Sequence, residues 1–540
     1  MFNHKSASLV ALAGAADLAS AALYDSIIQT GSGPVQGFAA FNSTPYGVNI
    51  QNWQDVAVWK GIPYGASTAG NNRWRPPQTP EPWNTTLIAD SYGPVCPGES
   101  TSYTSDEDCL RINVWSAATS ADDALPVMVW NHPAGGSNQD PLFDGAGMAA
   151  AGVVFINSNR RDGVLGWLAH PELSEERLAT IGVNSSGNYG MLDEFAVLDW
   201  AIQNVAAFGG DPKRINIAGQ SAGSAAAYHA VNSPLTKGKI VGAIAESGVR
   251  DPRDPLAHSL AENYVSLASN LAQGVEYMAA NNVSSIAELR AIPIADLLDA
   301  DGTSGSFGST SYSWSATLDN YTIAHKYIDQ LALGPANDVP FMTGNTKDES
   351  GATYGLEMTE AEYLSDFNTT FGNLSAEAEA LWAPSDWTNE TVIGGAYNAL
   401  WRDTSLVSSW GYSQGWASSA ESPIYTYYWD HAPPGQDRGA YHESEINYVL
   451  NNLYGTDLPW ETVDYEIAQK MNAYWANFAK TGNPNRGGSY SGNETLVQYD
   501  ATSSDRIVMH VGNGWGMVPL TQFDNQTDFI LEYFSLQTPV

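Results

Sequence analysis

The sequence predicts an α/β fold, with a large, mostly parallel central sheet that carries helices on both faces. Short, nearly continuous apolar runs recur along the chain, and turns and longer helical stretches follow them. Neither a fixed-period repeat nor a long Pro/Ser/Gly-rich linker divides the chain. Hydrophobic residues make up 43% of the sequence and aromatic residues 11%, which is enough apolar material for a large core and excludes a disordered protein.

Six apolar runs are the predicted strands. We expect them at Pro126–Trp130, Val153–Ile156, Ile215–Ala218, Ile240–Ile244, Val339–Met342 and Ile424–Tyr428. Strands this apolar are covered on both faces, and a parallel sheet places its functional side chains at the carboxyl ends of its strands. The segment Leu256–Asn337 is instead mainly helical, with a Gly/Ser-rich patch at Gly302–Ser313, and we expect it over the sheet or beside the site entrance.

The charge of the chain excludes two classes of partner. With 23 Lys+Arg against 59 Asp+Glu, the 540-residue chain has a formal net charge of −36. Nucleic acids and anionic membrane surfaces bind clustered Lys and Arg, so we expect neither as a partner. Metal-ligand spacing is absent from the sequence, and we expect no metal and no cofactor. Nothing in the sequence indicates the oligomeric state.

The N-terminus has the pattern of a secretory signal peptide, which we place at residues 1–21. A short polar start with Lys5 precedes an apolar run, Ala7–Ala16, and then the small residues Ala19–Ala21. Asp17 interrupts the apolar stretch, so a buried N-terminal helix is the alternative. We expect cleavage after Ala21 and a secreted, extracellular protein. No other segment reaches the roughly 18 apolar residues that a membrane span needs.

Two further features agree with export. Cys96 and Cys109 are the only cysteines and lie close in sequence, so an oxidising compartment would join them in a short-loop disulfide. The chain also carries ten Asn-x-Ser/Thr sequons, of which we expect some but not all to be glycosylated. The sequon asparagines are Asn42, Asn84, Asn184, Asn282, Asn320, Asn368, Asn373, Asn389, Asn493 and Asn525.

The central chemical signal is the Gly-x-Ser-x-Gly pentapeptide Gly219–Gly223. It stands directly after an apolar strand and directly before an Ala-rich helix, which is the context of a nucleophile elbow. Small neighbours are needed because the turn is tight and holds Ser221 in a strained conformation. The alternative is an ordinary helix N-cap after a strand. We predict that Ser221 is a nucleophile.

A serine nucleophile needs a base and an acid that orients the base, and on this architecture they follow in the order serine, acid, histidine. The strand at 339–342 is followed by Asp348 and Glu349, either of which could be the acid. Among the later histidines, His510 ends an apolar strand and has a structural role. Order and loop position favour His442 over His431 as the base.

The transition state also needs donors for its oxyanion. The small-residue turn Asn131–Ser137 follows an early strand, and its backbone N–H groups could face the nucleophile. A plain strand-to-helix loop is the alternative.

These motifs, with further stretches that run from about residue 30 to the C-terminus, resemble the type-B carboxylesterase/lipase family, the α/β-hydrolases that include cholinesterases and secreted fungal lipases. The matching stretches are Val58–Tyr64, Ser105–Trp115, Gly187–Asp193, Ala207–Pro212, Gly219–Gly223 and Tyr474–Asn485. The resemblance implies the α/β-hydrolase fold, with helical insertions around the active-site entrance. It also implies one domain over residues 22–540, whereas length alone suggests three or four.

Carried over by position, the resemblance implies Ser221 as nucleophile, Glu349 and not Asp348 as acid, and His442 as base. It further implies oxyanion donors from Ala134, Gly135 and Ala222, a Cys96–Cys109 disulfide, and a buried ion pair between Arg73 and Glu107.

The chain departs from the family pattern in three places. Pro133 has no N–H, but it precedes the expected donors; the alternative donor pair is Gly135 with Gly136. Gln220 stands where the family usually has a glutamate. The loop between the cysteines is short and holds no Trp, so choline esters are not the expected substrate.

We therefore expect a secreted serine carboxylesterase that hydrolyses neutral, moderately apolar esters through an acyl-enzyme. Its activity should fall on acidification through about pH 6 to 7 as His442 protonates. The alternatives are an acyltransferase on the same triad, a lipase and, with less support, a non-catalytic binding protein. We expect residues 137–150, 300–320 and 400–415 to shape the substrate pockets.

Overall fold

The structure is a computed structural model that describes residues 22–47, 50, 52–98, 103–260, 263–301, 312–490, 492, 495, 497–502 and 504–540. The predicted signal peptide, the sequon at Asn493 and most of the Gly/Ser-rich patch lie outside the described residues.

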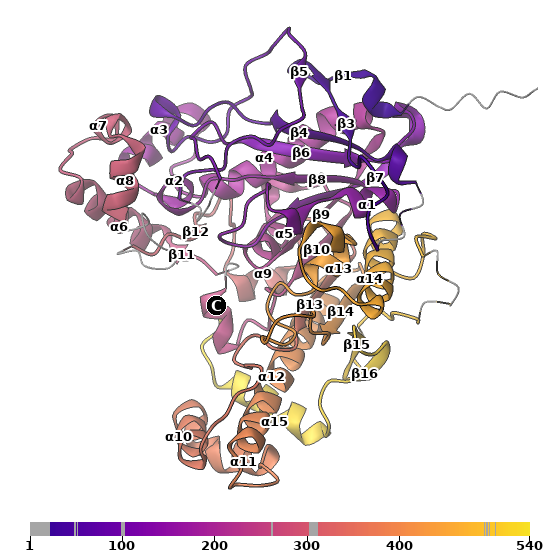
Figure 1. The fold of residues 1–540 in the computed structure, drawn as a ribbon. Helices are drawn as coiled ribbons and strands as arrows, with labels where there is room; N and C mark the ends of the chain where they lie inside the picture. Colours follow the sequence, from indigo (N-terminus) through magenta and orange to yellow (C-terminus); the bar gives the residue numbers. More distant parts are fainter. Residues whose placement is uncertain are drawn as a thin grey trace, which may run out of the picture.

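One 11-stranded sheet runs through the centre of the molecule, in the order β16-β15-β14-β13-β10-β9-β7-β8-β6-β4-β3 (Figure 1). Its strands are β3 (Phe38–Ala39), β4 (Ala57–Pro63), β6 (Arg111–Ser116), β7 (Leu125–Asn131), β8 (Val154–Ser158), β9 (Gly210–Gln220), β10 (Gly242–Glu246), β13 (Phe341–Thr346), β14 (Ile424–Trp429), β15 (Ile507–Val511) and β16 (Gly516–Pro519).

The six predicted strands are β7, β8, β9, β10, β13 and β14, and they lie side by side in the sheet. Every pairing among these six is parallel, whereas β3, β4, β6 and β16 pair antiparallel at the two edges. The prediction of a mostly parallel sheet is confirmed. The strand boundaries differ from the predicted ones by up to five residues. Strand β10 starts and ends two residues later than the apolar run at 240–244, and β9 starts five residues before the run at 215–218.

Helices cover the sheet, and they are α1 (Ala146–Ala150), α2 (Gly163–Trp167), α3 (Pro171–Ile181), α4 (Tyr189–Asn204), α5 (Ala222–Asn232), α6 (Leu267–Ala280), α7 (Ile286–Ala291), α8 (Ile294–Asp301), α9 (Tyr327–Leu333), α10 (Glu360–Phe371), α11 (Ser375–Leu381), α12 (Glu390–Ser419), α13 (Ile446–Leu450), α14 (Thr462–Thr481) and α15 (Asp524–Ser535). Two small sheets contain β1 (Ile27–Gln29), β2 (Pro34–Gln36) and β5 (Leu87–Ile88), and β11 (Val265–Ser266) with β12 (Thr317–Leu318).

Alternate residues of the central strands enter two separate cores. Val127 and Val129 of β7 pack in one core with α4 and α5, while Met128 and Trp130 pack in the other with α1, α13 and α14. Successive side chains of a strand point to opposite faces, so a strand that is apolar at every position must be covered on both sides. The continuous apolar runs of the sequence have this physical cause.

Two helical groups extend beyond the sheet. Helices α6, α7 and α8 pack with α2 and α3 in one hydrophobic cluster, and α10, α11, α12 and α15 form another at a different end of the molecule (Figure 1). The prediction that residues 256–337 are mainly helical is confirmed for the described part of that segment, which contains α6 to α9. Among the described residues, no helix is both long and apolar enough to cross a membrane.

The predicted disulfide and the predicted buried ion pair are both present. Cys96 and Cys109 form a disulfide with their Cα atoms 5.0 Å apart. Arg73 forms a two-pronged ion pair with Glu107, with nitrogen–oxygen distances of 2.6 and 2.7 Å, and both residues are buried. Arg73 also donates to the Arg290 carbonyl at 3.1 Å, so this pair fastens the end of α7 to the body of the protein.

Candidate active site

Ser221 occupies a strained turn between β9 and α5. The strand ends at Gln220 and the helix begins at Ala222, which leaves Ser221 with φ 55° and ψ −118°. A positive φ is unfavourable for a residue with a Cβ and persists only where its surroundings hold it. Here the Ser221 N–H donates to the Glu246 carbonyl at the end of β10, at 2.9 Å. The strand–turn–helix expected from the sequence is present.

The two glycines of the pentapeptide allow close backbone packing. A Cβ at Gly219 would lie 2.3 Å from the Gly223 carbonyl oxygen, and one at Gly223 would lie 1.9 Å from the Asn131 carbonyl oxygen. Real side chains do not fit at such distances, so only glycine lets the start of α5 approach the end of β7. This approach brings the turn that follows Asn131 beside Ser221.

Glu349 and His442 are in direct contact. Glu349 follows β13, His442 lies in the loop before α13, and the distance from His442 Nδ1 to Glu349 Oε2 is 2.5 Å. The other carboxylate oxygen of Glu349 accepts from the Thr346 N–H at 2.9 Å. The Glu349 side chain is only 5% exposed, whereas that of His442 is 41% exposed. The Glu349 carboxylate is therefore shielded from solvent, whereas the His442 imidazole is accessible.

The neighbouring candidates have structural contacts instead. Asp348 pairs with Arg402 and accepts from the Ala440 N–H at 2.8 Å, which holds the loop that carries His442. His431 lies 2.8 Å from an Asp464 carboxylate oxygen. Of the two acids and two histidines that sequence order left open, the structure joins Glu349 with His442.

Electrostatics favour an ionised acid beside this histidine. Burial by itself would raise the pKa of Glu349, but its hydrogen bond to His442 and the charge of that ring outweigh burial and leave the pKa below its usual value. Burial likewise lowers the pKa of His442, yet the hydrogen bond and charge of Glu349 prevail and raise it above its usual value of 6.5. The imidazole is thus a stronger base than an isolated histidine.

Buried carboxyls that the sequence analysis missed lie close to this pair. Glu246, at the end of β10, accepts from Trp475 Nε1 at 2.7 Å, and Glu445 follows His442 by three residues. Both are fully buried; burial raises both pKa values, and the charges of Glu246 and Glu349 raise that of Glu445 further. Glu246 could have been noticed in the sequence, because it is a charged residue at the end of an apolar strand.

Gln220 places a neutral amide against the His442 ring. Its Nε2 lies 3.3 Å from His442 Nδ1 and 3.4 Å from His442 Nε2, and the side chain is fully buried. A carboxylate at this position would be the fourth, beside Glu246, Glu349 and Glu445, and would add to the repulsion among the buried acids.

The turn after β7 contains the backbone N–H groups that the sequence analysis named as oxyanion donors. The Gly136 N–H is used within the turn, where it donates to the Pro133 carbonyl at 3.2 Å. Within the described residues, no hydrogen bond occupies the N–H groups of Ala134 and Gly135. The Ala222 N–H belongs to the first residue of α5, where a helix has no internal acceptor for it. These contacts favour Ala134 and Gly135 over the alternative pair that includes Gly136.

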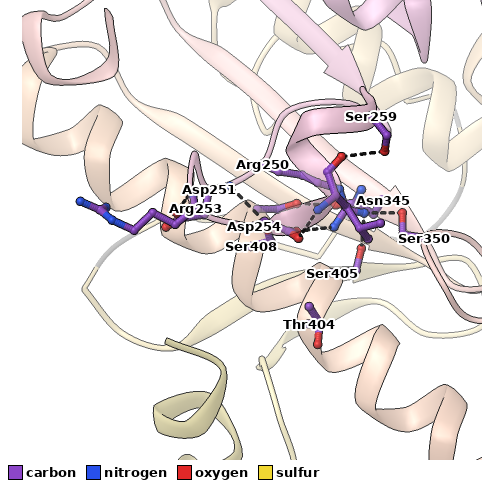
Figure 2. A network of polar contacts seen from close by, with 12 residues as sticks. Arg250, Asp251, Arg253, Asp254, Ser259, Asn345, Ser350, Thr404, Ser405 and Ser408 are labelled. Atoms are coloured by element: carbon purple, nitrogen blue, oxygen red, sulfur yellow. Dashed lines mark hydrogen bonds and ion pairs between the residues drawn. The ribbon is translucent and has the colours of Figure 1, made fainter. Parts of the chain in front are cut away.

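A buried arginine network contacts Ser350, the residue that follows Glu349 (Figure 2). Arg250 follows β10 and donates to Asp254 at 2.9 Å and to Ser405 of α12 at 3.0 Å. It also hydrogen-bonds to the hydroxyl of Ser350, the residue after Glu349. The network ties three segments that are distant in sequence, and so it limits movement of the acid.

A cavity of about 180 Å³ lies next to these donors and is lined by Ala134 and Ala222. Arg160, which follows β8, and Glu194 of α4 also line it, and the sequence analysis named neither. Among the described residues of the segments that we expected to shape the pockets, 314–316 are the ones that line this cavity. Within the described residues, no cluster of three or more His, Cys, Asp or Glu side chains could hold a metal ion.

Comparison with known proteins places the chain in a family. The profile of the carboxylesterase family matches residues 24–529. Fumonisin B1 esterase of Sphingopyxis macrogoltabida is 31% identical over 80% of both chains. Para-nitrobenzyl esterase of Bacillus subtilis (strain 168) is 30% identical over 82% of this chain and 90% of that one.

A solved structure agrees with these matches. The carboxylesterase of Geobacillus stearothermophilus superposes with a TM-score of 0.70 and 26% identity, covering 93% of this chain and 99% of its own. The sheet, its flanking helices and the sequence matches therefore have one explanation: the chain belongs to the carboxylesterase family and is a carboxylic ester hydrolase with the α/β-hydrolase fold.

Proposed function

We propose that this protein is a secreted serine carboxylesterase that hydrolyses neutral, moderately apolar esters through an acyl-enzyme. Ser221 is the nucleophile, His442 the general base and Glu349 the acid that orients it. The observation that carries the proposal is the 2.5 Å contact between Glu349 and His442, together with the strained turn that presents Ser221.

In the proposed mechanism, His442 takes the proton of Ser221 as the hydroxyl attacks the ester carbonyl. Glu349 holds the Nδ1 proton of His442, which leaves Nε2 as the accepting atom and stabilises the imidazolium that forms. The Ala134, Gly135 and Ala222 N–H groups donate to the tetrahedral oxyanion. His442 then returns the proton to the leaving alcohol, and water repeats both steps on the acyl-enzyme.

The proposal is tested by Ser221→Ala, with Ser259→Ala as a matched control at an exposed serine. We expect wild type and Ser259→Ala to hydrolyse p-nitrophenyl acetate and to react with a fluorophosphonate probe. Ser221→Ala should do neither, while its far-UV circular dichroism and melting temperature stay near those of wild type, because alanine keeps the Cβ and fits the same turn. Ester turnover by a folded Ser221→Ala protein would overturn the assignment.

Export is the second part of the proposal. It is supported by the signal-like pattern of residues 1–21, by the Cys96–Cys109 disulfide and by the exposure of all nine sequon asparagines that the structure describes. Expression in a eukaryotic host should yield protein in the medium that begins at Ala22 and shifts in mass when its glycans are removed. Protein that stays in the cell with residues 1–21 attached would contradict it.

A further inference from the structure

The cavity of about 180 Å³ is joined to the proposed reaction centre. Two of its lining residues, Ala134 and Ala222, are the ones whose N–H groups we assign to the oxyanion. A group that hangs from the reacting carbonyl or from the leaving oxygen can therefore reach it. In a protein interior, an apolar cavity of about 150 Å³ holds one benzene ring. The size fits one aromatic ring or a short chain.

The apolar walls suit a flat ring. Trp167 and Trp314 contribute indole rings, and Ala225 and Ala226 of α5 contribute only methyl groups, which leave room above the helix. Both indoles are held in place. Trp167 Nε1 donates to Asp162 Oδ1 at 2.6 Å, and Trp314 stacks on Tyr312 with the ring centres 5.5 Å apart. Ordered aromatic walls bind rings by offset or edge-to-face contact.

One wall is polar and is built from a charged set. Arg160 Nε lies 3.3 Å from Glu194 Oε1, and its Nη2 lies 3.9 Å from Asp162 Oδ2. Arg160 Nη1 also donates to the His132 carbonyl at 3.1 Å, which ties this wall to the turn that carries Ala134. The side chains of Arg160 and Glu194 are only 5% and 6% exposed. Such buried, braced groups can recognise a hydrogen-bonding group on a ligand.

The charges on this wall disfavour an ionised ligand. The Arg160 guanidinium and the Asp162 carboxylate offset each other, so an ionised group would gain little net attraction in return for losing its hydration. Burial raises the pKa of Glu194 to about 8, so near neutral pH its carboxyl is largely protonated and can both donate and accept. A neutral hydroxyl matches this wall because it can also donate and accept.

We propose that this cavity is a substrate subsite that takes an uncharged aromatic ring bearing a hydroxyl group, carried on one half of the ester. The proposal rests on the proposed function, since it assigns the specificity of the same reaction centre.

The first test is a series of esters assayed on the full-length enzyme. The acyl series consists of p-nitrophenyl acetate, 3-phenylpropanoate, 3-(4-hydroxyphenyl)propanoate and the 4-carboxyphenyl and 4-(aminomethyl)phenyl analogues. A second series places the same rings on the alcohol half of acetate esters. In one of the two series, kcat/KM for the hydroxyphenyl ester should exceed that of the charged analogues and of the unsubstituted ring by about tenfold. Equal values across both series would overturn the proposal.

The second test fills the cavity. Ala226→Leu adds bulk at its wall, and Ala179→Leu makes the same change at an exposed position of α3. The ratio of kcat/KM for the hydroxyphenyl ester to that for acetate should fall about tenfold in Ala226→Leu and stay at the wild-type value in Ala179→Leu. An unchanged ratio in Ala226→Leu would place the ring elsewhere.

The third test needs no turnover and so separates the subsite from the triad. Calorimetry with 4-ethylphenol should detect binding to wild type and to Ser221→Ala, and loss of binding in Ala226→Leu. If no variant hydrolyses esters but this pattern appears, the triad assignment fails and the subsite stands. The subsite assignment fails if esters are hydrolysed but 4-ethylphenol binds wild type and Ala226→Leu equally well. It also fails if esters are hydrolysed and 4-ethylphenol binds neither protein.

Discussion

Replacing Glu194 by glutamine removes a carboxyl group whose ionised form is disfavoured by burial in the folded protein. Glu194 is fully buried, and burial raises its pKa from 4.5 to about 8; the charge of Arg160 opposes this shift, and the charges of Asp162 and Asp193 add to it. Below pH 8 the folded protein therefore carries this carboxyl in its neutral form. Glutamine has the same shape and is neutral at every pH, and its carbonyl oxygen can still accept from Arg160 Nε.

The sign of the effect follows from proton binding. As pH rises from 4.5 to 8, the unfolded chain releases the Glu194 proton while the folded protein keeps it, so the wild type loses stability with rising pH. Each pH unit in this window changes the free energy of unfolding by about 1.4 kcal/mol. The whole window from 4.5 to about 8 then corresponds to about 4 to 5 kcal/mol, which the Glu194→Gln variant does not lose.

The assay is urea unfolding followed by tryptophan fluorescence at pH 5, 6.5, 8 and 9. The variant should unfold at nearly the wild-type urea concentration at pH 5 and at a clearly higher one at pH 8 and 9. Glu175→Gln, at an exposed position of α3, is the matched control and should follow the wild type at every pH. Parallel curves for wild type and Glu194→Gln would show that this carboxyl ionises normally, and the reasoning would be wrong.

Three other expectations concern the reaction centre and the disulfide. In Glu349→Gln the amide can donate to His442 Nδ1 and favour the tautomer that cannot accept the serine proton. We expect kcat for p-nitrophenyl acetate to fall about 10³- to 10⁴-fold with little change in KM. A loss below tenfold would argue against Glu349 as the acid. In the wild type, kcat/KM should fall with decreasing pH through a single protonation above pH 6.5, because Glu349 raises the pKa of His442; a midpoint below 6.5 would contradict this. Cys96 and Cys109 are 13 residues apart in sequence. The double variant Cys96→Ser/Cys109→Ser should therefore lose about 3 kcal/mol of unfolding free energy, measured by urea titration. A loss under 1 kcal/mol would mean that the loop is ordered without the bond.

The sheet and the nucleophile turn could be predicted because their signals are local. The six central strands are apolar at consecutive positions because both faces of the sheet are covered, and this pattern can be read directly from the sequence. The Gly219–Gly223 motif is also a local signal, because its five residues stand between an apolar run and an Ala-rich segment, although the contact that requires glycine at 223 is with Asn131 of β7. The family resemblance added the choice of Glu349 and His442.

Sequence order alone could not choose between Asp348 and Glu349. Adjacent residues after a strand point in different directions, and the direction depends on how the chain leaves the sheet. The structure turns Asp348 toward Arg402 and the loop at Ala440, and Glu349 toward His442. The choice among histidines had the same limit, since it depends on which loop returns to the carboxyl ends of β9 and β13.

The sequence by itself determined the fold class, the six central strands, the disulfide and the position of the strained serine. These features depend on side-chain periodicity, on short loops or on glycine at fixed offsets. Only the tertiary structure decided what surrounds the serine. The cavity beside it is built from Ala134, Arg160, Glu194, Ala226 and Trp314, which lie on five separate segments. Each has an ordinary local sequence, and the buried charges acquire their properties from burial and from partners that only the folded chain brings together.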